Sequence, residues 1–287
     1  MAVLSGNPGV THIIAHPDAA VEPPGDEITA DIARECANDV IEALKALGVT
    51  ERGAVTLEVL DTVLSTRAWR AEDDAEGEPA DAVIWDELVS RTREESTLTV
   101  TFVMFLCLAC LIAAIGVMTD SPVTVVGAMV VGPEFGPLAA LAVALVRRRT
   151  SLARRATLAL LIGFPVAMIV TAVFTLAFEA LGWVTLETTR GLNEVDFIFR
   201  VGPLSFAVAL LAGAAGMLSL VSSKSAALVG VFISVTTVPA AGFAVVAATV
   251  GDWSIAAQSA AQLAVNLVGI TVAGVLVLWI YQLRRSR

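Results

Sequence analysis

Charged residues are scarce in this chain, and their scarcity argues against a soluble protein. Only 16% of the 287 residues are charged and 56% are hydrophobic, whereas soluble domains hold about 25% and about 45–50%. The surplus apolar surface must therefore face lipid. Residues 1–97 carry 21 acids and 7 bases, and residues 98–287 carry 7 acids and 11 bases. The sequence thus predicts an acidic domain over 1–97 and a membrane domain over 98–287.

Several motifs are also missing. No basic stripe that could bind phosphates lies outside the membrane loops, which excludes nucleic acid as a partner. No basic start followed by an apolar core occurs over residues 1–25, so we expect the N-terminal domain to be cytoplasmic. Because no nucleophile elbow, phosphate loop or paired metal motif is present, we expect neither an enzyme nor a cofactor, and no nucleotide-driven transport.

Cysteine and histidine offer little for a metal or redox site. Cys36, Cys107 and Cys110 cannot form a disulfide framework, and the last two share one face of an apolar helix. A zinc site would need a second pair of ligands, so packing is the favoured interpretation over redox or metal chemistry. His12 and His16 would lie on one side of a predicted strand without a third ligand nearby.

Six apolar runs are long enough to span a membrane, for which a helix needs about 20 residues. They cover residues 98–118, 121–146, 152–180, 201–221, 225–250 and 255–281. Basic residues gather before the first span, at Arg147 to Arg155 between the second and third, at Lys224 between the fourth and fifth, and after the sixth. These four places lie on one side of a six-span protein, so we predict cytoplasmic N- and C-termini.

The spans repeat along the sequence. Spans 1 to 3 align with spans 4 to 6 at an offset of 103 residues, so that Val126-Gly127 falls on Val229-Gly230 and Ser151 falls on Ser254. Each half, about 98–180 and 201–283, has an odd number of spans, so the second half must enter from the opposite side. The pattern predicts an inverted repeat, an arrangement of secondary transporters with a substrate site near the midplane.

The middle span of each half contains helix-breaking residues. Span 2 holds Gly132, Pro133, Glu134, Gly136 and Pro137. Span 5 holds Thr236, Thr237 and Pro239, and Pro239 lies one position from the repeat mate of Pro137. Each motif alone is compatible with a simple proline kink. The matched pair favours broken helices that line a buried site, because irregular backbone is not tolerated against lipid.

Two stretches identify a family. Residues 113–122 and 126–137, with Gly-Ala-Met at 127–129 followed by the paired prolines Pro133 and Pro137, resemble a prokaryotic family of hydrophobic proteins catalogued as domain of unknown function 389. The resemblance covers about residues 98–281 and implies a prokaryotic plasma (inner) membrane protein without an assigned activity. Glu134 stands at a position that is usually apolar in the family.

The polar residues of the spans are the candidates for chemistry. A carboxylate at Glu134 could receive a cation or a proton, or could lie in a water-filled vestibule. Gln258, Gln262 and Asn266 recur every four residues on span 6 and could bond to other helices or line a pore. Thr236 and Thr237 could satisfy backbone freed by Pro239 or contact a substrate.

Two regions carry further predictions. Ala209, Ala212, Gly213 and Gly216 give span 4 a small-residue face for either internal packing or a subunit contact. In the acidic domain the patterns predict a strand over Val10 to His16, an amphipathic helix over Glu27 to Leu47, a strand over Ala54 to Leu64 and a loop over Glu72 to Asp81. We expect a small α+β cytoplasmic domain, with a ferredoxin-like fold as one possibility.

The sequence as a whole predicts an α-helical membrane protein of six spans in two inverted three-helix repeats with broken middle helices. The favoured function is a secondary transporter or channel for a small ion or solute, in a homo-oligomer. The predicted pathway consists of ten residues, Gly132, Pro133, Glu134, Gly136, Pro137, Thr236, Thr237, Pro239, Gln262 and Asn266. The alternative is a membrane-anchored sensor, regulatory or scaffold protein that signals through its cytoplasmic domain.

Overall fold

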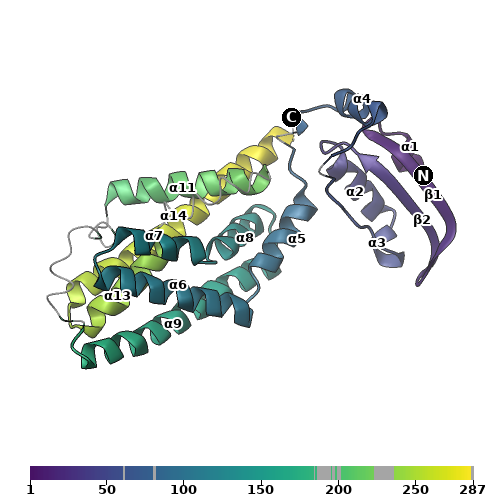
Figure 1. Cartoon of the computed structure of the whole chain (residues 1–287). Coiled ribbons are helices and arrows are strands. Elements are labelled where there is room, and N and C mark those ends of the chain that lie inside the picture. Colours follow the sequence, from purple (N-terminus) through teal and green to yellow (C-terminus); the bar gives the residue numbers. More distant parts are fainter. Residues whose placement is uncertain are drawn as a thin grey trace. The chain divides into compact units, whose positions relative to one another are not determined.

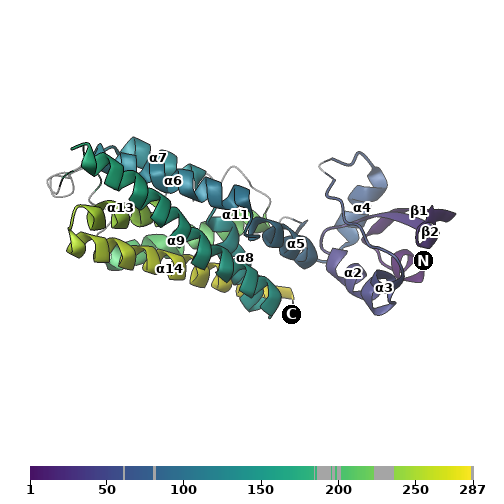
Figure 2. The same ribbon diagram turned by 90° about the horizontal axis from the view of Figure 1, so that it is seen from below.

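The computed structural model describes residues 1–60, 62–79, 82–183, 185, 195, 198, 202–222 and 236–285. The chain forms two compact units, Met1–Leu88 and Val89–Arg287. Figures 1 and 2 show that the first contains the two strands and that the second is helical. The boundary predicted between residues 97 and 98 follows the end of α5 (Trp85–Glu95).

The first unit is built on a β-hairpin. Its elements are α1 (Ala2–Ser5), β1 (Val10–Val21), β2 (Pro24–Ile32), α2 (Ala37–Ala46), α3 (Val49–Arg52), α4 (Thr66–Asp74) and the start of α5. The two strands pair antiparallel, with Val10 opposite Ile32 and Val21 opposite Pro24. Asn38 of α2 donates to the carbonyl of Val83 (2.7 Å) and accepts from the backbone N–H of Trp85 (3.1 Å). These bonds fasten the segment before α5 to α2.

Two predictions for this unit were wrong. The helix predicted from Glu27 begins only at Ala37, because residues 24–32 form β2 and pair with β1 across a short turn. The strand predicted over Ala54 to Leu64 is absent from its described residues, 54–60 and 62–64. A strand requires a hydrogen-bonded partner as well as alternation, and the described residues of this segment pair with neither β1 nor β2. The described sheet therefore has two strands, fewer than a ferredoxin-like fold requires.

The second unit contains the apolar helices. They are α6 (Val100–Met118), α7 (Pro122–Val131), α8 (Phe135–Val146), α9 (Thr150–Ala180), α11 (Pro203–Val221), α13 (Thr237–Thr249) and α14 (Trp253–Arg285). Four of them, α6, α9, α11 and α14, are long and apolar enough to cross a membrane, and the bent pair α7 and α8 makes a fifth candidate span. This unit is therefore that of a helical membrane protein. The remaining predicted span, span 5 over residues 225–250, is described only from residue 236 onward, where it forms α13.

The two longest helices pack in matching ways. Helix α9 contacts α6, α8 and α13, while α14 contacts α11, α13 and α8. Figure 1 shows α14 alongside α11. A Cβ on Gly213 of α11 would lie 2.7 Å from the Cα of Ile270 on α14, and one on Gly269 would lie 2.9 Å from the Cβ of Ala209. Gly213 and Ala209 thus serve internal packing between these helices.

Helix bounds recur at the offset found in the sequence. Helix α11 begins and ends 103 residues after α6, and α14 begins 103 residues after α9. The turns between helices correspond as well. The N–H of Arg149 donates to the carbonyl of Ala144 (2.9 Å), and that of Asp252 donates to the carbonyl of Ala247 (2.8 Å). Both pairs stand 103 residues apart, so the α8–α9 and α13–α14 turns have the same backbone bond.

Candidate functional site

The first predicted break is present. Helices α7 and α8 meet at an angle of 51°, and Gly132, Pro133 and Glu134 separate them. Gly132 has extended backbone angles (φ −65°, ψ 128°), while Glu134 begins α8 as its N-cap. Gly136 and Pro137 fall in the first turn of α8, where backbone N–H groups have no helical acceptor and proline loses nothing. Pro133 and Pro137 lie two residues before and two residues after Phe135, the first residue of α8, so they are compatible with the break and do not disrupt α8.

The structure describes the C-terminal side of the second predicted break, from Thr236 onward. Helix α13 begins at Thr237, with Thr236 as its N-cap and Pro239 as its third residue. Pro239 therefore occupies the same place in α13 as Pro137 does in α8. Residues 223–235, which would form the preceding half of this span, lie outside the described part of the chain.

The two segments contact each other through Glu134 and Thr237. The Thr237 hydroxyl donates to Oε1 of Glu134 at 2.5 Å. Both residues are buried, with 7% and 0% of their surface exposed. A Cβ on Gly132 would lie 2.8 Å from Cγ2 of Val238, so glycine permits this approach. The breaks are thus one joined structure, formed where two helices begin.

The second oxygen of Glu134 has no hydrogen-bond partner in the part of the chain that the structure describes. Among the described residues, Oε2 is buried and accepts no hydrogen bond. An unsatisfied buried polar group costs about 1–3 kcal/mol, and a charged one costs more. The N-termini of α8 and α13 both begin at this carboxylate, and their partial positive charges offset part of that cost. Glu134 is therefore held in place at one oxygen and available at the other.

A chain of hydrogen bonds extends the site from α13 to α14 and α11. Asn266 Nδ2 donates to the Thr236 hydroxyl (3.0 Å), and Gln262 Nε2 donates to Asn266 Oδ1 (3.0 Å). The Ser205 hydroxyl of α11 donates to Gln262 Oε1 (2.9 Å). Asn266 and Gln262 are 3% and 2% exposed. The amides therefore bond to other helices, and they do so beside the broken segments.

Three further polar residues near this chain of hydrogen bonds differ from what the sequence predicted. Gln258, which the sequence placed on the same stripe, is exposed and donates to Ser254 on its own helix, so it takes no part. Ser205 was not predicted, because a single serine near a helix start carries no signal. Ser259 was also missed, although it continues the face of Gln262 and Asn266, and its buried hydroxyl has no partner among the described residues.

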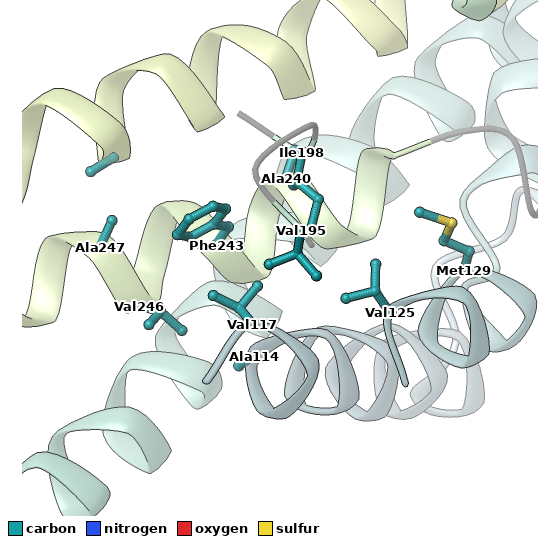
Figure 3. Packing of buried hydrophobic residues seen from close by; sticks show 11 residues of the cluster. Ala114, Val117, Val125, Met129, Val195, Ile198, Ala240, Phe243, Val246 and Ala247 are labelled. Carbon is teal, nitrogen blue, oxygen red and sulfur yellow. The ribbon is translucent and has the colours of Figure 1, made fainter. Parts of the chain in front are cut away.

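An apolar cluster lies beside these polar groups. Figure 3 shows it between α6, α7 and α13, with Val117, Val125 and Phe243 pointing toward one another. Val195 and Ile198, both 0% exposed, pack into the same cluster, and the Val195 N–H donates to Asp120 (3.2 Å). Ala240 joins the cluster one turn of α13 after Thr236. Apolar packing thus closes the site on this side.

The remaining candidates do not extend the site. His12 pairs with Asp31 (2.6 Å) and bonds to Ser65 (3.0 Å), so both of its ring nitrogens have partners in the first unit. Cys107 and Cys110 are free thiols, and Cys110 is fully buried in apolar packing. Among the described residues, no group of three or more His, Cys, Asp or Glu side chains could hold a metal ion.

Comparison with known proteins gives a family without an assigned function. No curated protein and no solved structure matches the chain. The model of one family, described as "Domain of unknown function (DUF389)", matches residues 129–272. The match begins at Met129, just before the first break, and extends past Asn266. It therefore contains every residue of the polar site and no residue of the first unit. The family predicted from the sequence is confirmed over the matched residues, which include the paired prolines Pro133 and Pro137, and the chain belongs to the DUF389 family.

Proposed function

We propose that this protein is a transporter or channel for a small cation, including the proton, with its site at Glu134. The observation that carries the proposal is the buried carboxylate at the contact of two helix starts, with one oxygen held by Thr237 and the other without a partner among the described residues. Burying an ionisable side chain among membrane helices costs free energy, so its presence there is a reason to propose a function. Carboxylate and hydroxyl oxygens are also the ligands that small hard cations prefer.

The proposed architecture is six spans in two inverted halves. Its support is the shared offset of 103 residues in helix bounds, turn geometry and packing partners. Glu134 and Thr237 are themselves 103 residues apart. In a protein with an internal twofold relation, residues that contact their own repeat mates lie at the axis. That position is where two halves that move against each other would share a substrate site.

The site lies near the middle of the longest helix. Asn266 is close to the centre of α14, whose 33 residues begin at Trp253 and end at Arg285. We place the basic loop Arg147 to Arg155 and both chain ends on the cytoplasmic side of a prokaryotic plasma membrane, because positively charged loops remain inside. A cation reaching Glu134 would then have to cross about half of the bilayer from either side.

Flux in proteoliposomes tests the proposal. Purified protein would be reconstituted, and the movement of H⁺, Na⁺ and K⁺ would be followed with entrapped fluorescent indicators. E134Q keeps the size of the side chain and removes its charge, so it should reduce flux by about tenfold or more, as expected when a charge-assisted contact of roughly 1.4 kcal/mol is lost. Thr237→Val should reduce flux to a smaller extent, because Glu134 keeps its charge.

A matched pair on α14 provides the control. Gln262→Ala interrupts the buried chain of hydrogen bonds, whereas Gln258→Ala alters the same stripe at an exposed position. Only the first should change flux. If E134Q carries the same flux as the wild type for every ion tested, Glu134 is a solvated residue and the site proposal fails. If the wild type itself carries none of these ions, the sensor or scaffold alternative is favoured.

A further inference from the structure

The turn between α8 and α9 borders a groove that the ion site does not use. The groove has a volume of about 440 Å³ and lies between the C-terminal parts of α8 and α14. Arg148, Gln282 and Trp279 supply its polar lining, and the rest is aliphatic, from Leu145 on α8 to Leu283 on α14. We propose that this groove binds an anionic phospholipid, with the phosphate on Arg148 and an acyl chain along the aliphatic wall. The proposal does not depend on ion transport.

Arg148 has a backbone conformation that favours glycine. Its φ is +52°, in the left-handed region that non-glycine residues seldom adopt. The corresponding turn of the second half, 103 residues later, has the same backbone bond and holds Gly251 with a φ of +83°. Glycine therefore suits this turn, and the first half has arginine instead. A residue kept in a disfavoured conformation is a reason to look for a function of its side chain.

Arg148 is an exposed cation in the lining of the groove. No ion pair among the described residues includes it. The two segments that line the groove cannot provide one, since the sequence has no acidic residue between Glu134 and Glu179 or after Asp252. Arg147 and Arg149 in the same turn and Arg154 near the start of α9 add to the positive charge. On these two segments an anionic ligand would therefore meet basic residues and no acidic one.

The form of the groove favours a lipid over a free anion. Trp279 is 54% exposed, and tryptophan is enriched where the acyl region of a bilayer meets the headgroups. Leu145 and Leu283 are also about half exposed (54% and 46%) at the ends of apolar helices. A free phosphate would use the arginine and leave these aliphatic side chains without a role. Basic pockets between membrane helices are typical headgroup sites.

Native mass spectrometry of the intact protein in mixed micelles tests this inference. Phosphatidylglycerol and phosphatidylcholine of identical chains would be supplied in equal amounts, and the ratio of bound lipids would be measured. The wild type should prefer phosphatidylglycerol. Arg148→Gly should lower that preference by about fivefold, the factor for one cationic side chain at an anionic surface. Because glycine suits the turn, this variant should unfold at the same temperature as the wild type or higher in lipid-free detergent.

Two controls distinguish a defined site from diffuse attraction. Arg154→Ala removes a nearby charge, near the start of α9, at a residue outside the groove lining, and it should keep most of the preference. An equal loss in both variants, or an unchanged preference in Arg148→Gly, would overturn the proposal. Inorganic phosphate alone should not raise the melting temperature. If it raises that temperature as much as phosphatidylglycerol does, the ligand is a free anion and the assignment to lipid is wrong.

Discussion

Described helices of the membrane unit that lie 103 residues apart in the chain have matching bounds but carry different polar residues. Helices α6 and α11 have equal length, and the turns before α9 and α14 share a backbone bond. At three matched positions the residues differ in kind: Glu134 against Thr237, Arg148 against Gly251, and Arg149 against Asp252. The helices therefore correspond at positions where the side chains differ in charge.

The first prediction concerns orientation and has an all-or-none result. Ser151 and Ser254 are repeat mates, and both are exposed at the starts of α9 and α14. In a background with Cys36, Cys107 and Cys110 replaced by alanine, single cysteines would be introduced at these two serines. An impermeant maleimide added outside whole cells should label Ser254→Cys and leave Ser151→Cys unlabelled until the membrane is opened. Labelling of both from outside would rule out an inverted repeat.

The second prediction concerns packing, where α11 requires glycine at a position that its counterpart does not. Gly213 approaches the backbone of Ile270, and Cys110 stands at the matched position of α6. Gly213→Ala should lower the free energy of unfolding by about 1–3 kcal/mol, because a Cβ there would force two helix backbones apart. Thermal unfolding in detergent would measure this.

Gly127 provides the matched control for that substitution. A Cβ there meets no described atom within 4 Å. Gly127→Ala should leave stability unchanged or raise it by up to about 1 kcal/mol, since alanine is the better helix former. If Gly213→Ala were equally harmless, the close contact of α11 with α14 would be refuted.

The third and smallest effect is expected at the two helix starts. Oδ1 of Asp252 accepts from the N–H of Ile255 (3.3 Å), whereas Arg149 makes no side-chain cap for α9. Asp252→Ala should cost about 1 kcal/mol through loss of this cap. Arg149→Ala should have no capping cost. Denaturant titration of both variants in the same detergent would compare them, and equal losses would contradict the capping argument.

Several features of the membrane unit could be predicted because they depend on local composition. Pro133 and Pro137 indicated the break between α7 and α8, and Thr236 with Pro239 lie at the start of α13. Four spans and the broken fifth follow from apolar length alone. Glu134, Gln262 and Asn266 were recognisable because polar residues are rare in such helices. In the first unit the hairpin was missed, since β2 depended on which strand would pair with β1.

Partners across helices could not be predicted in the same way. Nothing in the sequence joins Ser205 to Gln262, because helix packing decides which polar faces meet. The groove at Arg148 likewise arises from the distance between α8 and α14. Its one signal was an arginine at the position matching Gly251, which becomes informative only when the backbone conformation is known.

The hydrogen bond between Glu134 and Thr237 depends on unlike side chains at two positions that lie 103 residues apart. If the sequence of the first half were copied into the second, a carboxylate would replace Thr237 and face Glu134 across about 2.5 Å. Two like charges at that distance in an apolar interior repel strongly, so the pair would have to share a proton or separate. A hydroxyl at one of the two positions turns this repulsion into attraction. The asymmetry therefore allows a single carboxylate to occupy the place where the starts of α8 and α13 meet.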